Sequence, residues 1–139
     1  MFSHVILGAR DLERQGAFYD AVLAPLGLVR DPDESAEDGG PEGIIWVLPG
    51  RRWPQFCVQY PWNGEPATAG NGVQVSFAAT SHEAVDRAWA AALANGGSDE
   101  GAPGLRPHYA PDYYGAYARD PEGNKLCFVH AEGLDGPTV

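Results

Sequence analysis

The sequence is poor in cysteine and lacks the common catalytic and metal-binding signatures. It contains only two cysteines, Cys57 and Cys127, and neither belongs to a C-x-x-C pair. Two cysteines in 139 residues exclude a disulfide scaffold, and the missing C-x-x-C spacing excludes zinc ribbons and thioredoxin-type redox motifs. Walker loops and H-E-x-x-H motifs are also missing, so the sequence predicts neither a P-loop NTPase nor a zincin.

Positive charge and long apolar runs are scarce as well. Nine Lys and Arg residues face nineteen Asp and Glu residues, which gives a net charge of -10. Such a chain repels a phosphate backbone and an anionic lipid surface, so we expect no nucleic-acid partner and no membrane partner. No apolar run approaches the roughly 18 residues of a membrane span, and the first residues do not form a signal peptide. We therefore expect a soluble cytoplasmic protein.

The residues that are present fit one globular domain over residues 1–139. The chain is 44% hydrophobic and 20% charged, an ordinary composition for a protein with a hydrophobic core. Eighteen glycines and twelve prolines indicate many turns, but this Gly and Pro content is below that of a low-complexity chain. A chain of 139 residues is long enough to bury a core without disulfides or metals.

Two stretches of the chain repeat one pattern at an offset of 70 residues. Phe2–Ala9 is typical of a buried strand, and Asp11 then predicts the N-cap of a helix. Val73–Ala79 and Ser81 repeat this arrangement, and caps and helix stops recur in step, which indicates an internal repeat. The matched pairs are Val5 and Val75, Ala9 and Ala79, Glu13 and Glu83, Leu23 and Leu93, Gly27 and Gly97, and Cys57 and Cys127.

Each half of the repeat predicts a strand, a helix and further strands. The fold class is therefore α+β, with two βαβββ modules in tandem over residues 1–63 and 72–133 and a Gly- and Pro-containing linker over residues 64–71. The later strands are expected at Leu28–Arg30, Gly43–Leu48, Gln55–Tyr60, a short run near Ser98, Tyr113–Ala118 and Lys125–His130.

Two motifs lie near the two ends of the chain. The first runs from His4 through Phe18-Tyr19 to Gly27, and the second is Asp120-Pro121-Glu122-Gly123-Asn124-Lys125. They resemble the opening and the D-P-x-G-N turn of the vicinal-oxygen-chelate superfamily, which includes glyoxalase I, bleomycin-resistance proteins, fosfomycin-resistance proteins and extradiol dioxygenases. The likeness covers essentially the whole chain. It implies curled sheets around a cleft, a small-molecule ligand, a divalent metal in many members and a homodimer.

The resemblance also implies four metal-ligand positions, on the first and last strand of each module. The first falls on His4 and the third on Gln74, so these two residues are the expected ligands of a divalent metal. The second and fourth, where the family carries Glu, fall on or near Cys57 and Cys127. Thiolates are good zinc ligands, and free cysteines are also common apolar filler, so both interpretations stay open. Without a metal, the four side chains would line the floor of a ligand cleft.

The densest group of chemically active side chains is the segment Arg106–Tyr114. His108 is the candidate acid-base residue, because imidazole titrates near neutral pH. Tyr109, Tyr113 and Tyr114 would bind or orient a ligand, although the segment is equally typical of a rigid, Pro-bounded loop. Trp46 lies on the equivalent strand of the first module, where it would line the cleft or belong to the core.

One further segment is strongly acidic. It superficially resembles a calcium loop, but the sixth position, which requires Gly, is Ala36. We therefore expect a solvated loop, which could close over the cleft. Its acidic residues are Asp31, Asp33, Glu34, Glu37, Asp38 and Glu42.

The sequence leaves three functional hypotheses open. The first is a glyoxalase-like protein with a small-molecule site, acting as a lyase or dioxygenase-type enzyme with a degenerate metal site. The second is a non-catalytic protein that binds or sequesters a drug or metabolite. The third is an interaction module whose ancestral site has decayed. Fold alone does not choose among them.

Overall fold

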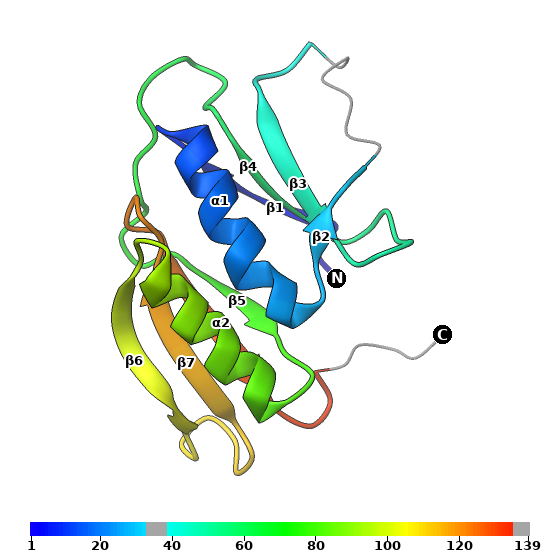
Figure 1. The fold of residues 1–139 in the computed structure, drawn as a ribbon, viewed down its shortest axis with the longest axis vertical. Helices are drawn as coiled ribbons and strands as arrows, with labels where there is room; N and C mark the ends of the chain where they lie inside the picture. The colour runs from blue at the N-terminus through cyan, green and yellow to red at the C-terminus, as the bar shows by residue number, and fades with distance from the viewer. Residues whose placement is uncertain (33–38, 135–139) are drawn as a thin grey trace.

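The computed structural model describes residues 1–32 and 39–134. It contains the two predicted modules, each with one α-helix and four strands (Figure 1). The first module comprises β1 (His4–Gly8), α1 (Leu12–Leu23), a short 3-10 helix η1 (Ala24–Leu26), β2 (Val29–Arg30), β3 (Gly43–Val47) and β4 (Gln55–Gln59). The second comprises β5 (Gln74–Ala78), α2 (His82–Ala94), β6 (Ser98–Leu105), β7 (Tyr114–Arg119) and β8 (Lys125–His130). None of the described helices has the length and apolarity needed to span a membrane.

The two sheets have the same topology. The first sheet has the strand order β1-β4-β3-β2 and the second has β5-β8-β7-β6. In each sheet the first and last strands of the module pair in parallel, and the other pairs are antiparallel. Ile6 pairs with Cys57, and Ser76 pairs with Cys127, so the offset of 70 residues is kept in the strand register. The predicted tandem βαβββ fold is confirmed.

The helices begin where the sequence predicts. The carboxylate of Asp11 accepts a hydrogen bond from the amide of Arg14, and the hydroxyl of Ser81 accepts one from the amide of Ala84. Such caps satisfy amides that have no partner inside the helix, and each stabilises the helix by about 1 kcal/mol. After η1 the chain turns at Gly27, whose φ of 84° lies in the left-handed region where glycine is favoured.

One strand is longer than predicted. The sequence indicates only a short run near Ser98, whereas β6 continues to Leu105. The strand lies at the edge of the second sheet, where Pro103 need not donate to a further strand. Its pairing with β7 shifts register on both sides of Gly101.

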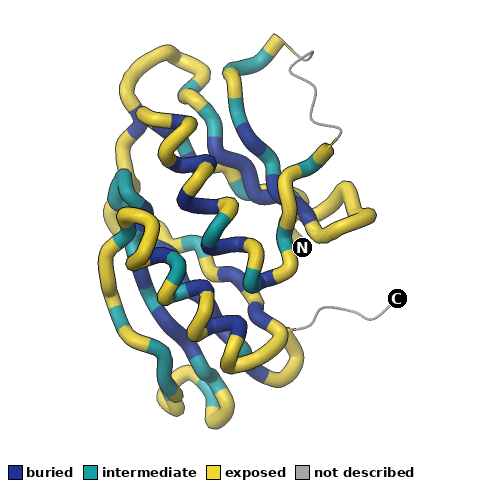
Figure 2. Tube along the Cα trace, viewed as in Figure 1, coloured by how far each residue is buried: buried dark blue, intermediate teal, exposed yellow. Residues whose placement is uncertain are grey.

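One hydrophobic core joins the modules. Helices α1 and α2 lie side by side in front of the two sheets (Figure 1), and the strands turn alternate side chains toward them. The ring of Phe56 from β4 lies 5.1 Å from that of Phe77 in β5, so the core crosses from one sheet to the other. Figure 2 shows the buried positions along the strands and on the inner sides of the helices. The opposite side of each sheet, which we call its open face, faces away from the helices.

A buried carboxylate ties the D-P-x-G-N turn to the first module. Asp120 is 3% exposed and accepts hydrogen bonds from the side chains of Gln15 and Tyr19, both on α1. It also accepts from the amides of Glu122 and Asn124 within its own turn and from the side chain of Asn124. The turn therefore stabilises the contact between modules as well as the start of β8.

Candidate functional site on the open face of the second sheet

The four positions that resemble metal-ligand positions lie on the open faces of the sheets. His4 begins β1 and lies two residues before Ile6, which pairs with Cys57 in the β1–β4 register. Gln74 and Cys127 hold the equivalent places in the second module. Residues two apart on a strand share a face, so each module directs one pair of these side chains to its open face.

The chemistry at these positions does not fit a glyoxalase-type divalent metal. No position carries a carboxylate, the ligand that hard cations prefer. The amide of Gln74 donates to the hydroxyl of Ser76 at 2.9 Å, and Nδ1 of His4 lies 2.8 Å from the hydroxyl of Ser3. Cys127 is fully buried. Among the described residues, no three His, Cys, Asp or Glu side chains lie close enough together to hold a metal ion.

A hollow of about 520 Å³ opens on the second sheet instead. It brings together three of the predicted ligand residues, Gln74, Tyr109 and Tyr113, which are far apart in the sequence. We call it the second-sheet hollow. Its lining residues are Gln74, Glu100, Arg106, Tyr109, Tyr113, Tyr117 and Lys125.

Two phenols and a thiol form a connected polar group in the second-sheet hollow. The hydroxyl of Tyr113 lies 3.0 Å from the hydroxyl of Tyr117 and 3.4 Å from Sγ of Cys127. Gly115 makes this arrangement possible, because a Cβ there would lie 2.8 Å from Cε1 of Tyr113. The ring of Tyr113 therefore lies over Gly115, which has no side chain.

Both phenols keep their protons at neutral pH. Burial raises the pKa of Tyr113, and its hydrogen bonds with Cys127 and Tyr117 raise it further. Burial also raises the pKa of Tyr117. Neutral phenols donate and accept hydrogen bonds, so these side chains can orient a polar ligand but cannot act as ready bases.

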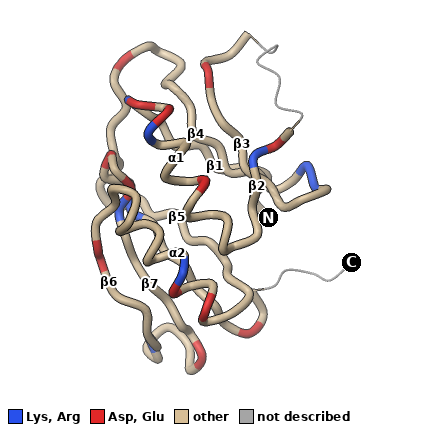
Figure 3. The backbone as a smooth tube through the Cα atoms, viewed as in Figure 1, with Lys and Arg blue, Asp and Glu red and all other residues tan. Residues whose placement is uncertain are grey.

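The hollow is positively charged in an acidic protein. In Figure 3, Lys and Arg positions, drawn in blue, are fewer along the backbone than Asp and Glu positions, drawn in red. Nζ of Lys125 and Cζ of Arg106 each lie 5.7 Å from the ring centroid of Tyr117. Glu100 is the one acidic lining residue, and its carboxylate is 2.6 Å from Nε of Arg119. The lining therefore has two positive charges and one negative charge, and the negative charge is already paired with Arg119.

The backbone of β6 positions Arg106. Positions for a Cβ at Gly104 and Gly101 would lie 3.1 Å and 3.4 Å from the nitrogens of the Arg106 guanidinium. The guanidinium thus folds back along the glycine-rich strand, where it donates a 2.8 Å hydrogen bond to the carbonyl of Ala102. Side chains at positions 101 and 104 would crowd the guanidinium of Arg106 in this conformation.

His108 lies beside the second-sheet hollow and does not line it. The residue is exposed on the loop between β6 and β7, and its ring is 4.1 Å from that of Tyr109. Tyr109 is 63% exposed and lies 5.0 Å from Tyr113. His108 is thus connected to the hollow through the ring of Tyr109, at its rim.

Two predicted ligand residues face the helices instead of the hollow. Trp46 is 1% exposed in the core, and its indole N–H donates to Asp20 of α1 at 3.0 Å, so the core interpretation of this residue holds. Tyr114 donates to Asp86 of α2 at 2.7 Å. The reason is strand alternation: Tyr114 precedes Gly115 on β7 and points to the opposite face. Neither residue can contact a ligand in the second-sheet hollow.

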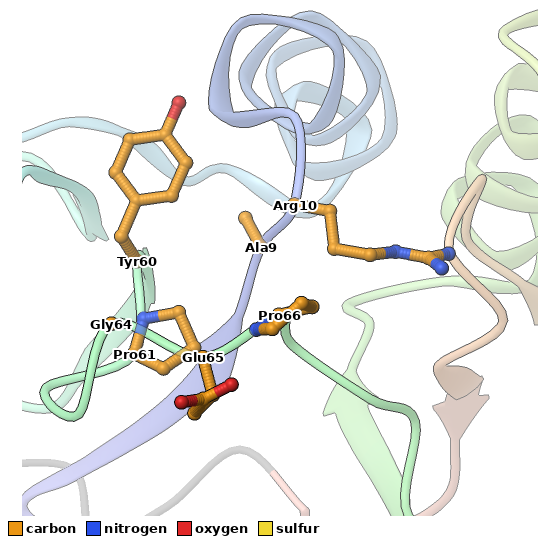
Figure 4. Close-up of a pocket in the computed structure, with 7 residues that line it drawn as sticks. All are labelled: Ala9, Arg10, Tyr60, Pro61, Gly64, Glu65 and Pro66. Carbon is orange, nitrogen blue, oxygen red and sulfur yellow. The ribbon is translucent and has the colours of Figure 1, made fainter.

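A hollow at the junction of the modules lacks converging polar groups. It has a volume of about 410 Å³ and is lined by Ala9, Arg10, Tyr60, Pro61, Gly64, Glu65 and Pro66 (Figure 4). In Figure 4 the side chain of Arg10 extends toward the second module, where its Nε lies 3.5 Å from Glu122. The side chains of Arg10 and Glu65 therefore point in different directions and do not converge on one ligand position.

The open face of the first sheet carries a third hollow of about 700 Å³. Apolar side chains from β2 and β3, Gln55 of β4 and the loop residues Arg51 and Arg52 contribute to its lining. Of the acidic segment considered as a calcium loop, Asp33, Glu34, Glu37 and Asp38 lie outside the described residues.

Sequence reasoning missed Tyr117 and Lys125. A signal for both was present, because Lys125 lies two residues before Cys127 and must share its face. Tyr117 pairs with Cys127 across β7 and β8, but that register is set by the fold and has no local sequence marker.

Comparisons with known proteins agree with this architecture. A family model described as "Glyoxalase-like domain" matches residues 4–129. A glyoxalase/bleomycin resistance protein from Albidiferax ferrireducens has a solved structure with 42% identity and a TM-score of 0.77, over 94% of this chain and 98% of that one. A comparison with curated proteins found no match.

More distant solved structures share the fold. A glyoxalase-related enzyme from Fulvimarina pelagi is 19% identical, with a TM-score of 0.69 over 100% of this chain and 96% of that one. Lactoylglutathione lyase from Agrobacterium tumefaciens is 21% identical, with a TM-score of 0.61 over 97% of this chain and 96% of that one. At such identities the likeness concerns the fold alone.

Proposed function

The chain belongs to the glyoxalase-like domain family, and we propose that it binds an organic small molecule in the second-sheet hollow without using a metal. The observation that carries this proposal is the convergence of Gln74, Tyr109, Tyr113, Tyr117 and Lys125 from four separate segments onto one open face. Ring faces, phenol hydroxyls, an amide and a cation are the groups by which proteins fix a small polar ligand. The metal-ligand positions, in contrast, offer no carboxylate.

A ligand panel with matched variants tests this proposal. The panel contains acids, amides and amines built on benzene, phenol and indole rings, and the readout is the melting temperature. A ligand that binds only the folded state raises it, with about 2.7 kcal/mol of stabilisation at a hundred times Kd. We expect at least one compound to stabilise the wild type and to lose that effect in Tyr109→Ala and Lys125→Met. Tyr60→Ala, which changes a tyrosine of the hollow at the module junction, is the control.

The proposal fails if no compound raises the melting temperature. It also fails if the compounds that do so stabilise Tyr109→Ala and Lys125→Met as much as the wild type. Either result favours an interaction module without a ligand site.

An enzymatic function of the same hollow is the second candidate. The contact between His108 and Tyr109 supports it, because the imidazole lies at the rim of the hollow and could exchange a proton with a bound molecule. For a compound found by the panel, an enzyme predicts that His108→Ala abolishes turnover and leaves Kd unchanged. A binding protein predicts that the compound is recovered unaltered, in stoichiometric amount, from both proteins.

The proposed oligomeric state is a homodimer. The open face of the first sheet exposes apolar side chains, with Ile6 48% exposed and Val29 46% exposed. A second copy would cover this surface, in keeping with the homodimers expected for the family. Light scattering on Ile6→Glu tests this, since a charge on the covered face should convert a dimer of the wild type into monomers.

A further inference from the structure

We propose that the ligand of the second-sheet hollow is an organic anion, a carboxylate attached to an aromatic or similarly planar group. This inference rests on the proposed function and adds the chemical class of the molecule. It depends on three observations: the balance of charge in the hollow, the lack of a counter-ion for Lys125 within the described residues, and the exposed ring of Tyr109 in the same lining.

The charge balance of the second-sheet hollow is opposite to that of the whole chain. The sequence has a net charge of -10, but the hollow is lined by two cations, Arg106 and Lys125, and one carboxylate, Glu100. Glu100 is already neutralised by Arg119, which also donates to the carbonyl of Gly123 at 2.9 Å. An incoming anion therefore meets two positive charges without a free negative charge beside them.

Lys125 is the best placed of the two cations. Within the described part of the chain its ammonium group makes no hydrogen bond or ion pair, and it lies over the ring of Tyr117. Arg106 makes one hydrogen bond, to the carbonyl of Ala102, which leaves most of its five N–H donors available. Half-buried cations without counter-ions attract carboxylates, and hydrogen bonds between such partners are about twice as strong as neutral ones.

The positions of the tyrosines indicate the other end of the ligand. Both cations already lie over the ring of Tyr117, so this ring helps to hold them. Tyr109 is 63% exposed at the rim, and its ring offers a surface for an aromatic group. A molecule with a planar ring against Tyr109 and a carboxylate near Lys125 would match this arrangement. The hydroxyls of Tyr113 and Tyr117 and the amide of Gln74 lie in the same lining and can donate hydrogen bonds to the anion.

Triads of matched compounds test the inference by calorimetric titration. Each triad keeps the ring and changes the charge: benzoate, benzamide and benzylamine; 4-hydroxybenzoate, its amide and its amine; and indole-3-acetate, indole-3-acetamide and tryptamine. We expect the acid of at least one triad to bind at least about tenfold more tightly than its amide and amine. Lys125→Met should remove that preference, and raising the salt concentration should weaken binding of the acid selectively.

The control is Arg51→Gln, which removes a positive charge from the loop of the first module. If Arg51→Gln weakens the acid as much as Lys125→Met does, the preference comes from overall charge and the inference is wrong. If amides or amines bind best and Tyr109→Ala removes that binding, the proposed function stands and the anionic class is wrong. If no compound of any triad binds, the proposed function fails and the inference with it.

Discussion

Gly115 holds open the space that the ring of Tyr113 occupies. A Cβ at Gly115 would lie 2.8 Å from Cε1 of Tyr113, closer than side chains pack, so any larger residue must displace the ring. The ring lies over Gly115, and its hydroxyl reaches Tyr117 and Cys127. One glycine on the open face thus determines where the polar group of the second-sheet hollow lies.

Gly115→Ala should therefore expose the thiol of Cys127. Overpacking of this kind costs about 1–3 kcal/mol, and the Tyr113 side chain is the part free to move. We expect a thiol reagent to modify Cys127 slowly in the wild type, where the residue is fully buried, and faster in Gly115→Ala. A Cys57→Ser background restricts the signal to Cys127. Tyr113→Ala should act similarly, whereas Tyr109→Ala should not; equal rates in all four proteins would contradict this account.

Tyr19 and Tyr113 should contribute to a fall in stability in strong base. Burial raises the pKa of Tyr19 well above the ordinary 10.0, aided by Asp120, and burial with hydrogen bonds raises that of Tyr113. The unfolded chain loses these protons first, so their contribution is complete below about pH 10 and is lost as the pH rises above it. The free energy of unfolding should decline above about pH 10, and less steeply in Tyr19→Phe and Tyr113→Phe. A decline of the same slope in all three proteins would show that other groups cause it.

The bond between Tyr19 and Asp120 should be worth more than an exposed one. The Tyr19 hydroxyl donates to the buried Asp120 carboxylate at 2.6 Å, across the two modules. Tyr114 makes a comparable 2.7 Å bond to Asp86, but at the exposed surface. We expect Tyr19→Phe to cost about 1.5–3 kcal/mol in urea unfolding, and Tyr114→Phe less than about 1 kcal/mol. If the two losses are equal, burial adds nothing to the bond at Asp120.

The fold could be predicted from the sequence because the helix caps are local patterns and one occurs in each module. Asp11 and Ser81 cap their helices, and both caps hold in the structure. The offset of 70 residues between them then aligned strands that had little pattern of their own. The length of β6 was missed because Pro103 and Gly101 are typical of loops, and an edge strand with an irregular register accepts them.

The candidate site was only partly predictable, because it depends on which face each residue occupies. Tyr113 and Tyr114 are neighbours in the chain, yet one lines the second-sheet hollow and the other bonds to Asp86 on α2. Chemical type alone could not separate them, whereas strand alternation can once the strand boundary is known. Tyr117 enters the hollow through its pairing with Cys127, a relation that only the folded register supplies.

The metal-ligand positions provide the last test. Their side chains offer an imidazole, an amide and two buried thiols, with no carboxylate. We therefore expect elemental mass spectrometry of protein purified without an affinity tag to find far less than one metal ion per chain, even after incubation with zinc, nickel, manganese or iron. The Gln74→Ala and His4→Ala variants should give the same low values as the wild type. Stoichiometric metal in the wild type that disappears in Gln74→Ala would reverse this conclusion, because it would mean that thiols and an amide form a working centre. The ligand experiments would then have to be repeated on the metal-loaded protein.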